Sequence, residues 1–584
     1  MKALDLRLTS LRERYLAGTL APARLCAEIA KRCDATVADN IWIHRLTSDE
    51  LAPYLARLKS MDPATLPLYG IPFAIKDNID LAGIPTTAGC PAFAYVPASS
   101  AFVVERLIEA GAIPIGKTNL DQFATGLTGT RSPFGATRNA FNANYIAGGS
   151  SAGSAVACAK NLVSFALGTD TAGSGRVPAA FNNLIGVKPT RGRLSARGVV
   201  PACRSLDTVS IFAHSLHDAA AVLQEASIFD PDDPYARPEE AAGSVHEKYR
   251  VGVPRQLEFR ADADAERLFR QLLERLRSRG GEIIDIDFAP FLAAARLLYA
   301  GPWVAERYAA IKSFITEAPE ALHPITRAII EPAKSRTAVE AFEAQYELQS
   351  LKRTTDTILA GLDYVLTPTT PTIFTFEELA RDPIELNNAL GHYTNFMNLL
   401  DYAAVAVPSG IGSHGVPYGA TLFGPAHSDE RLIDYAARLL DEPPVAVGDR
   451  RAAAPNATLK LVVCGAHMSN LPLNSQLLDR GARLVDAAHT APTYRLYVLP
   501  GGPPARPGLV RVAAEGAAIA VEVWELPTAR FGDFIQAIPA PLAIGTVALA
   551  DGSALKGFLC EAHATTGARD ITEFGGWRDY LISI

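Results

Sequence analysis

The stretch GGSSAGSAVACAKNLVSFALGTDTAGSGRVP, residues 148–178, places Ser150 and Ser174 in two separate runs of glycine and alanine. Small residues around a serine let a substrate carbonyl approach the backbone closely and let backbone N–H groups converge on one point. Lys76 precedes this stretch and ends the apolar run of residues 69–76. The pattern indicates a serine nucleophile that has a lysine as its base.

The distribution of histidines supports a lysine base. No histidine lies between His44 and His214, so a Ser-His-Asp triad would need a base from a distant part of the sequence. A lysine acts as a base only when its pKa is lowered, and burial beside an apolar strand has that effect. Ser150 opens a predicted helix, where it can relay a proton between Ser174 and Lys76. The residues therefore predict a Ser-Ser-Lys hydrolase.

The nucleophile of such an enzyme also needs donors for the oxyanion that develops during attack. The loop before Ser174 follows an apolar strand and is rich in glycine. We predict an oxyanion hole made by the backbone N–H groups of Thr171, Ala172, Gly173 and Ser174.

In these motifs the chain resembles the amidase signature enzymes. The resemblance covers Lys76, the GGSSAGS loop and the DTAGSGRVP loop, at the spacing of the family. It implies that Ser174 is the nucleophile, that Ser150 is a bridging serine on a cis peptide after Gly149, and that Lys76 is the base. Runs of glycine and serine also occur in flexible turns, but that alternative does not account for all three residues together.

Three further segments, residues 121–141, 299–311 and 395–408, are similar to one branch of this family, the allophanate hydrolases. The resemblance implies a small carboxylated amide as substrate and ammonia and N-carboxycarbamate as products. Arginine suits a carboxylate because its guanidinium donates two parallel hydrogen bonds. We expect Tyr299 and Arg307 to clamp the carboxylate, with Thr125 and Gly126 contributing from the loop that faces the nucleophile.

Several alternatives remain open from the sequence. Arg307 can instead lie on a solvated helix face beside Glu306, and Arg131 can hold its loop through backbone carbonyls. We expect Asp170 and Asn119 to be supporting hydrogen-bonding groups. The alternative activities are an amidase for another small acid amide, such as malonamate, and the glutaminase component of a tRNA-dependent amidotransferase. The latter has no long C-terminal β domain, which argues against it.

A second motif suggests nucleotide binding but lacks the required context. Residues 111–118, GAIPIGKT, satisfy the P-loop pattern. A P-loop has its strand before the first glycine, whereas here a predicted helix precedes Gly111 and the strand lies inside the motif. We therefore expect no nucleotide site.

The predicted fold class is α/β, with two domains. Residues 1–440 alternate strand and helix patterns typical of a layered α/β/α domain with a mixed central sheet, after a helical lead-in over residues 1–60. We expect a helix over residues 396–408. Residues 441–456 are predicted to be a linker, and residues 457–584 a smaller, mostly β (α+β) domain that resembles gamma-glutamyl cyclotransferases.

The C-terminal domain of allophanate hydrolases is implicated in decarboxylating the first product. By this resemblance we expect His467 to be the functional residue, with Asn470 and Asn474 as ligand contacts. The catalytic acid of the cyclotransferases has no clear counterpart in this sequence, and we consider Glu561 as a candidate for it. A binding or assembly module, docking a urea carboxylase for example, is the alternative.

Composition narrows the functional class. The net charge of −7 over 584 residues argues against a nucleic-acid partner, and no apolar run reaches the length of a membrane span. The seven cysteines lack C-x-x-C spacing, so we expect free thiols, no metal and a cytoplasmic protein. We expect no cofactor. The resemblance implies a homodimer and a functional link to a urea carboxylase.

Overall fold

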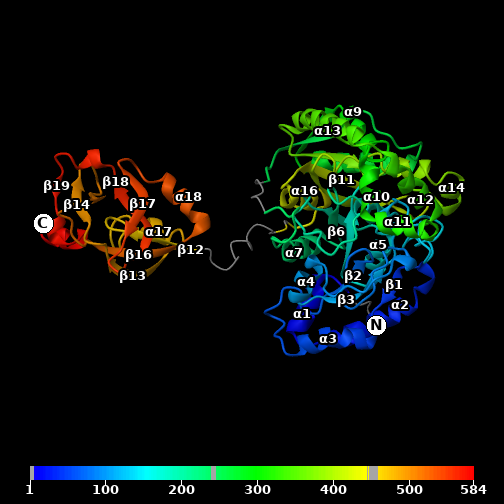
Figure 1. Cartoon of the computed structure of the whole chain (residues 1–584), viewed down its shortest axis with the longest axis horizontal. Helices are drawn as coiled ribbons and strands as arrows, with labels where there is room; N and C mark the ends of the chain where they lie inside the picture. The colour runs from blue at the N-terminus through cyan, green and yellow to red at the C-terminus, as the bar shows by residue number, and fades with distance from the viewer. Residues whose placement is uncertain (1–4, 239–244, 444, 446–457) are drawn as a thin grey trace. The chain divides into compact units, whose positions relative to one another are not determined.

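A computed structural model of the chain describes residues 5–238, 245–443, 445 and 458–584. It contains two compact units, Met1–Val447 and Gly448–Ile584, each with its own hydrophobic core (Figure 1). Most of the predicted linker, residues 444 and 446–456, lies outside the described residues. No helix among the described residues is long and apolar enough to cross a membrane.

The first unit is built on one mixed sheet, as the sequence predicts. Its described strands are, in spatial order, β1 (Trp42–Arg45), β3 (Ile113–Thr118), β2 (Pro72–Lys76), β4 (Phe165–Asp170), β6 (Thr208–Ala213), β5 (Ile185–Lys188), β10 (Tyr402–Ile411), β11 (Pro417–Pro425), β9 (Tyr364–Pro368), β7 (Tyr249–Pro254) and β8 (Gly281–Ile286). β3, β2 and β4 pair in parallel, as do β9, β7 and β8, while the strands between them are antiparallel.

Helices pack along this sheet. α5 (Ala152–Ala159) and α6 (Arg176–Phe181) contact each other and the central strands, while α4 (Phe102–Glu109), α7 (Leu216–Ala226), α16 (Asp429–Leu440) and α8 (Ala263–Ser278) contact one another in succession. β2 and β4 are buried along their whole length. Successive side chains of a strand point to opposite faces of the sheet, so a strand is buried throughout when both faces are covered.

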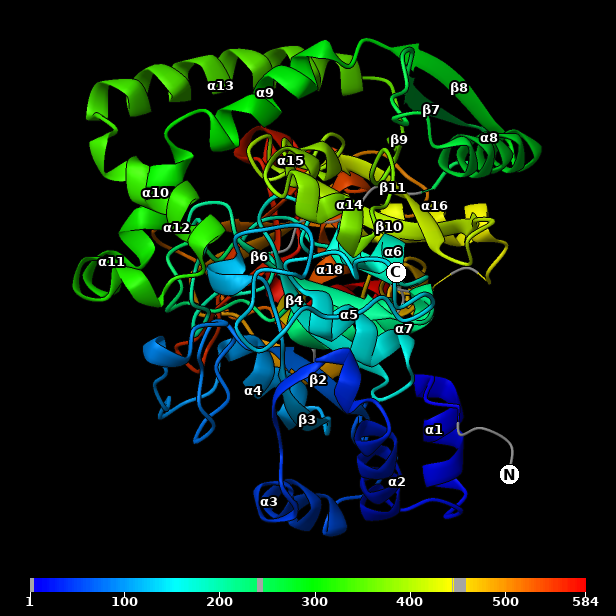
Figure 2. The same cartoon turned by 90° about the vertical axis from the view of Figure 1, so that its right-hand side faces the viewer.

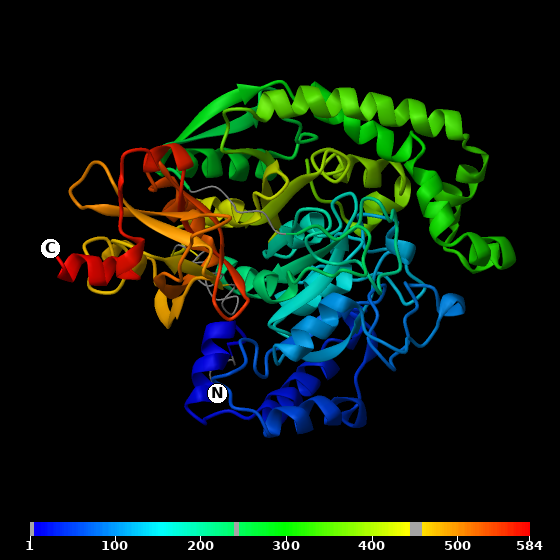
Figure 3. The ribbon, with the colours of Figure 1, turned by 60° about the vertical axis from the view of Figure 1, so that its left-hand side comes forward.

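A helical region follows β8. α9 (Ala289–Tyr299) and the long α13 (Ala338–Leu359) lie side by side, and α10 (Trp303–Ala310) and α12 (Pro324–Ile330) continue from their ends (Figures 2 and 3). The remaining helices of the first unit are α1 (Leu8–Leu16), α2 (Pro22–Asp34), α3 (Ser48–Lys59), α11 (Lys312–Glu317), α14 (Phe376–Arg381) and α15 (Glu385–Leu390).

Two predictions about this unit were wrong in part. The lead-in 1–60 is mainly helical, but Trp42–Arg45 forms β1 and pairs with β3 at the sheet edge. The helix expected over residues 396–408 is absent: residues 391–401 form turns, and β10 begins at Tyr402. β10 lies between β5 and β11, where a run of small and β-branched residues fits a doubly covered strand.

The expectation that residues 111–118 are not a P-loop is confirmed. α4 precedes Gly111, and β3 occupies the interior of the motif. Lys117, which would bind phosphate in a P-loop, is buried and forms an ion pair with Asp77 at 3.1 Å.

The second unit contains a five-stranded and a three-stranded sheet among the described residues, in keeping with the predicted mostly β domain. The first has the order β13 (Arg483–His489), β16 (Ala520–Pro527), β12 (Thr458–Val463), β18 (Ala554–Cys560) and β17 (Leu542–Ala548). The second has the order β15 (Arg506–Arg511), β14 (Tyr494–Leu499) and β19 (Arg569–Asp570). Its helices are α17 (Ser475–Leu478), α18 (Thr528–Gln536) and α19 (Trp577–Ile582).

Candidate active site

The parallel strands β3, β2 and β4 bring polar residues to one edge of the sheet. β2 ends at Lys76, and β4 ends with Thr169 and Asp170. The carboxyl ends of neighbouring parallel strands meet at the same edge, which is where open α/β sheets bind ligands. The predicted base and the loop before the predicted nucleophile are therefore brought together by the sheet itself.

Lys76 lies at the centre of this edge and is fully buried. Its Nζ donates to Ser150 Oγ at 2.7 Å and to Thr169 Oγ1 at 2.7 Å. Burial lowers the pKa of Lys76 to about 7, although the carboxylate of Asp121 acts in the opposite direction. A neutral amine is thus accessible near neutral pH, as a lysine base requires.

Ser150 lies on the predicted cis peptide: the Gly149–Ser150 bond is cis. A Cβ at Gly149 would overlap the Asp121 carboxylate and the backbone N of Gly129, so this position requires glycine. Asp121 in turn accepts from the backbone N–H groups of Gly129 at 2.9 Å and Arg131 at 2.8 Å. These contacts fix the loop that carries Ser150 against the loop of residues 125–131.

Ser174 is almost fully buried, with 3% of its surface exposed. Its Oγ approaches the carbonyl oxygen of Gly126 at 3.5 Å. Gly173 precedes it with φ 132°, a conformation that strongly favours glycine, and a Cβ there would overlap the side chain of Thr394. The hydroxyl therefore faces the 125–126 loop, as the sequence predicts.

Asp170 holds the loop that carries Ser174. Its carboxylate accepts from Gly173 N at 2.8 Å and Gly175 N at 3.1 Å, and it pairs with Arg176 Nε at 2.9 Å. Burial by itself raises the pKa of Asp170, but the Arg176 guanidinium outweighs that and lowers it below its usual value. The expected supporting role of Asp170 fits these contacts.

The same contacts alter the predicted oxyanion hole. The N–H of Gly173 already donates to Asp170, so it is not free for an oxyanion. Within the described residues, the N–H groups of Thr171, Ala172 and Ser174 donate no hydrogen bond. These three remain the available donors at the loop.

We expect Asp170→Ala to lower the free energy of unfolding of the first unit by about 3–5 kcal/mol. The substitution leaves the buried Arg176 guanidinium without its carboxylate, and an uncompensated buried charge has a cost of that size. Urea unfolding of the full chain measures the loss. Arg267→Ala, which removes an exposed ion pair to Asp264, is the control and should change stability by less than about 1 kcal/mol. A similar loss in both variants would contradict the assignment.

Arg307 does not lie on a solvated face, so that alternative was wrong. Only 2% of its surface is exposed, and Nη1 donates to Thr125 Oγ1 at 3.0 Å. Its guanidinium lies over the ring of Tyr299, 5.3 Å from the centroid, and Nη2 is 3.4 Å from the Tyr299 hydroxyl. The buried Nε has no hydrogen-bond partner among the described residues. One donor of this buried cation is thus available for a ligand.

Arg131 and Asn119, like Asp170, have structural contacts. Arg131 donates to the carbonyls of Thr125 and Pro383, each at 3.0 Å, which is the loop-holding alternative. Asn119 donates to the carbonyls of Asn40 at 2.9 Å and Gly135 at 2.8 Å. Both residues fix the loops around the site through backbone carbonyls.

Sequence reasoning missed three polar residues at the site. Thr169 shares Lys76 with Ser150, and Asp121 joins two active-site loops. Asp207 accepts from the hydroxyl of Thr171 and from Ala202 N, and burial raises its pKa to about 6. None of the three had a usable signal in the sequence, because each is identified by contacts between segments that are distant along the chain.

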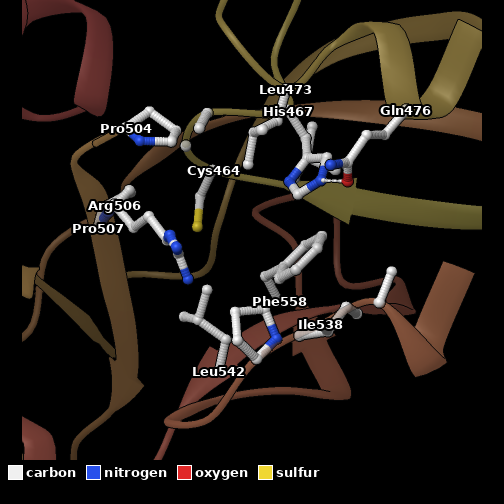
Figure 4. A pocket seen from close by; sticks show the side chains of 15 residues that line it. Cys464, His467, Leu473, Gln476, Pro504, Arg506, Pro507, Ile538, Leu542 and Phe558 are labelled. Carbon is white, nitrogen blue, oxygen red and sulfur yellow. Dashed lines mark hydrogen bonds between the residues drawn. The ribbon is translucent and has the colours of Figure 1, made fainter. Parts of the chain in front are cut away.

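Of the residues predicted to act in the second unit, the structure brings some near one cavity and leaves others exposed. His467 lines a cavity in this unit, shown in Figure 4. Asn474 is buried and donates to the carbonyl of His467 at 2.9 Å, so it orients the loop. Asn470 is exposed, and Glu561 is exposed and pairs with His563 at 3.2 Å. Neither of these last two lines the cavity.

Comparison with known proteins agrees with this geometry. Residues 26–433 match the Amidase family. The chain belongs to the amidase family. Residues 459–582 match the family described as the allophanate hydrolase C-terminal domain. Since the amidase match includes Lys76, Ser150 and Ser174, the chain is an amidohydrolase with an added C-terminal domain.

Two relatives resemble it over nearly its whole length, and a third resembles it over about two thirds. It is 43% identical to the urea amidolyase of Saccharomyces cerevisiae over 96% of this chain, but it spans 32% of that protein. It is 40% identical to the allophanate hydrolase of Kluyveromyces lactis, with a TM-score of 0.72 and coverage of 98% of this chain and 99% of the other. A glutamyl-tRNA(Gln) amidotransferase protein of Synechococcus sp. is 36% identical over 63% of this chain and 82% of its own length.

Proposed function

We propose that this chain is an allophanate hydrolase that converts allophanate and water into ammonia and N-carboxycarbamate. The observation that carries the proposal is the buried Arg307, which contacts Thr125 beside the glycine that faces Ser174. A cation on the loop that faces the nucleophile suits a small amide that also carries a carboxylate. The K. lactis relative, similar over the whole chain, is an allophanate hydrolase by its name.

The proposed reaction starts from the contact between Lys76 and Ser150 and places Ser174 next in the relay. Neutral Lys76 takes the proton of Ser150, which takes that of Ser174, while Ser174 Oγ forms a bond to the terminal amide carbonyl of the substrate. The N–H groups of Thr171, Ala172 and Ser174 stabilise the oxyanion. The C–N bond then breaks and the relayed proton leaves with ammonia. Water attacks the acyl-enzyme by the reverse relay and releases N-carboxycarbamate.

Arg307 sets the substrate class in this proposal. Its Nε is free for a carboxylate oxygen, and Tyr299 presents a hydroxyl beside the same guanidinium. A charged hydrogen bond in a buried site is stronger than in water, so the clamp distinguishes a carboxylated amide from a neutral one.

We expect Arg307→Ala to raise KM for allophanate by roughly 10- to 100-fold, the effect of losing charged hydrogen bonds worth about 1.5–3 kcal/mol. Activity on a neutral amide of similar size, such as propionamide, should change little. Steady-state ammonia release measures both. Arg296→Ala, on the neighbouring helix α9, is the control. An Arg307→Ala enzyme with the wild-type preference for allophanate would place the clamp elsewhere.

One comparison of substrates tests the activity itself. Purified protein is given allophanate, malonamate or glutamine, and ammonia is followed. Turnover of malonamate or glutamine without turnover of allophanate would overturn the proposal. The glutaminase alternative has weaker support, because the amidotransferase match covers 63% of this chain and the allophanate hydrolase match covers 98%.

The second unit is proposed to assist decarboxylation of N-carboxycarbamate, with His467 as the functional residue. We also propose a cytoplasmic homodimer whose substrate comes from a urea carboxylase. The similarity to urea amidolyases, of which this chain spans about a third, supports that link. A binding or assembly role for the second unit is the alternative. Carbon dioxide release that does not change on removing residues 457–584 would favour it.

A further inference from the structure

A carboxylate lies behind the loop that carries the proposed oxyanion donors. Asp207 immediately precedes β6, and its carboxylate accepts a hydrogen bond from the hydroxyl of Thr171. The backbone N–H of Thr171 is one of the three donors that remain available beside Ser174. Asp170 holds the same loop further along, at the N–H of Gly173. Asp207 therefore contacts, from outside the loop, a residue whose N–H is available for the oxyanion.

The contacts of Asp207 fix the direction of this hydrogen bond. Its carboxylate also accepts from Ala202 N at 2.8 Å and Cys203 N at 3.2 Å, so both oxygens are in use. With a pKa of about 6 the group is ionised at neutral pH and can only accept. The Thr171 hydroxyl must therefore donate. Threonine is stiff at χ1, so holding its hydroxyl also restrains its backbone.

The chain before this carboxylate is itself held on two sides. Glu306 of α10 accepts from Ser205 N at 2.6 Å and from Ser205 Oγ at 2.7 Å. The side chain of Asn398 donates to the carbonyl oxygens of Leu206 and Asp170, each at 2.7 Å. The place of the carboxylate is thus set by α10 and by the turn before β10, which are separate from the loop that it restrains.

The oxyanion loop needs such restraint from its neighbours. Ala172 and Gly173 have no polar side chain with which to hold themselves, and Gly173 has the backbone freedom of glycine. Donors to an oxyanion are effective only when they are already in place before the reaction, and a displacement of about 1 Å can cost up to about 100-fold in rate. Contacts with Asp170 and with Asp207 restrain the two sides of this glycine-containing segment.

We propose that Asp207 is a positioning residue for the hydrolysis: through the Thr171 hydroxyl it holds the Thr171 N–H toward the developing oxyanion. It does not contact the reacting atoms. The inference rests on the proposed nucleophile Ser174 and its loop, and it is independent of which amide is the substrate. Failure of allophanate as a substrate would therefore count against the proposed function alone, and malonamate or another amide that the enzyme hydrolyses then serves as the probe.

Asp207→Asn keeps the size of the side chain but turns one acceptor oxygen into a donor. We expect kcat to fall roughly 10- to 100-fold, because a donor is misplaced. KM should stay within about threefold of the wild type, because Arg307 and Tyr299 are unchanged. Initial rates of ammonia release over a range of substrate concentrations give both constants. A loss in kcat without a loss in KM is not the effect of a general folding defect.

The partner of this hydrogen bond provides an independent test. Thr171→Val removes the hydroxyl but keeps the shape of the side chain, and its kcat should fall by a similar factor. Because both substitutions break one contact, the double variant Asp207→Asn/Thr171→Val should lose no more than the weaker of the two single variants. Thr171→Ser keeps a hydroxyl that can donate to Asp207. It should therefore lose less activity than Thr171→Val.

Asp230→Asn is the matched control, since Asp230 is also a buried aspartate that holds a loop. Among the described residues it accepts from Ser195 Oγ at 2.8 Å and pairs with Arg197 at 2.8 Å, both outside the active site. Its kcat should stay within about twofold of the wild type. Thermal unfolding shows which variants are folded, and the Thr171 variants decide if Asp207→Asn is not. Wild-type kcat in folded Asp207→Asn or Thr171→Val, a loss confined to KM, or single losses that multiply in the double variant would overturn the inference.

Discussion

Replacing Ser174 by alanine is expected to lower kcat for allophanate on the order of 10⁴-fold or more. The alanine removes the atom that forms the bond to the substrate carbonyl, and loss of the nucleophile in comparable serine enzymes has an effect of that size. Binding should persist, because Arg307 and Thr125 are untouched. Ammonia release under single-turnover conditions measures the loss of activity. Calorimetric titration with malonate, a stable dicarboxylate, measures whether binding at Arg307 is retained.

Ser210→Ala is the matched control for this variant. Ser210 lies on β6 and is buried beside Gly175, the residue after Ser174, and its hydroxyl has no hydrogen-bond partner among the described residues. Its removal should leave kcat within about twofold, since no hydrogen bond is lost. Activity in Ser174→Ala above about one percent of the wild type would assign the nucleophile to another residue, Ser150 first.

Residues at the ends of buried strands and in adjacent loops could be predicted from the sequence. Lys76 ends an apolar run, and a lysine there is either paired or poised to lose its proton. Ser150 and Ser174 lie in loops where the small neighbours indicate close packing of backbone. These features are local in sequence, so the chemistry could be inferred without knowledge of the sheet order.

Residues that depend on tertiary packing could not be predicted in the same way. The pattern of α10 places Arg307 beside Glu306 and does not show which side of the helix is covered. The apolar residues of β10 are equally compatible with a buried helix. They form a strand because they pair with β5 and β11, and the sequence does not show that pairing. The cavity that His467 lines could not be predicted either, because it is assembled from five separate segments.

The N–H groups of the loop before Ser174 are a second case in which the sequence does not show the contacts. The sequence predicts four N–H groups near Ser174, but only the fold shows that Asp170 occupies that of Gly173. A side chain three residues earlier competes for a donor that the predicted oxyanion hole would use. Which groups are left for a substrate depends on such local competition.

Lys76→Met is expected to reduce kcat/KM for allophanate as severely as Ser174→Ala, on the order of 10⁴-fold, because the side chain that accepts the relayed proton is gone. Methionine keeps much of the volume of the buried chain and carries no charge. The unfolding midpoint should therefore stay close to that of the wild type, which separates a catalytic loss from a folding defect. Initial rates of ammonia release and thermal unfolding provide the two measurements.

The pH dependence of kcat/KM in the wild type tests whether Lys76 is the base. The neutral amine is the base, so kcat/KM should rise about tenfold per pH unit below the pKa of Lys76, about 7, and level off above it. Asp121 raises that pKa, and Asp121→Asn should therefore move the limb to lower pH. A limb that does not move in Asp121→Asn, or a flat profile between pH 5 and 8, would mean that another group accepts the proton. A shift toward lower pH ties the limb to a buried cation beside Asp121, and Lys76 is the cation whose Nζ contacts Ser150.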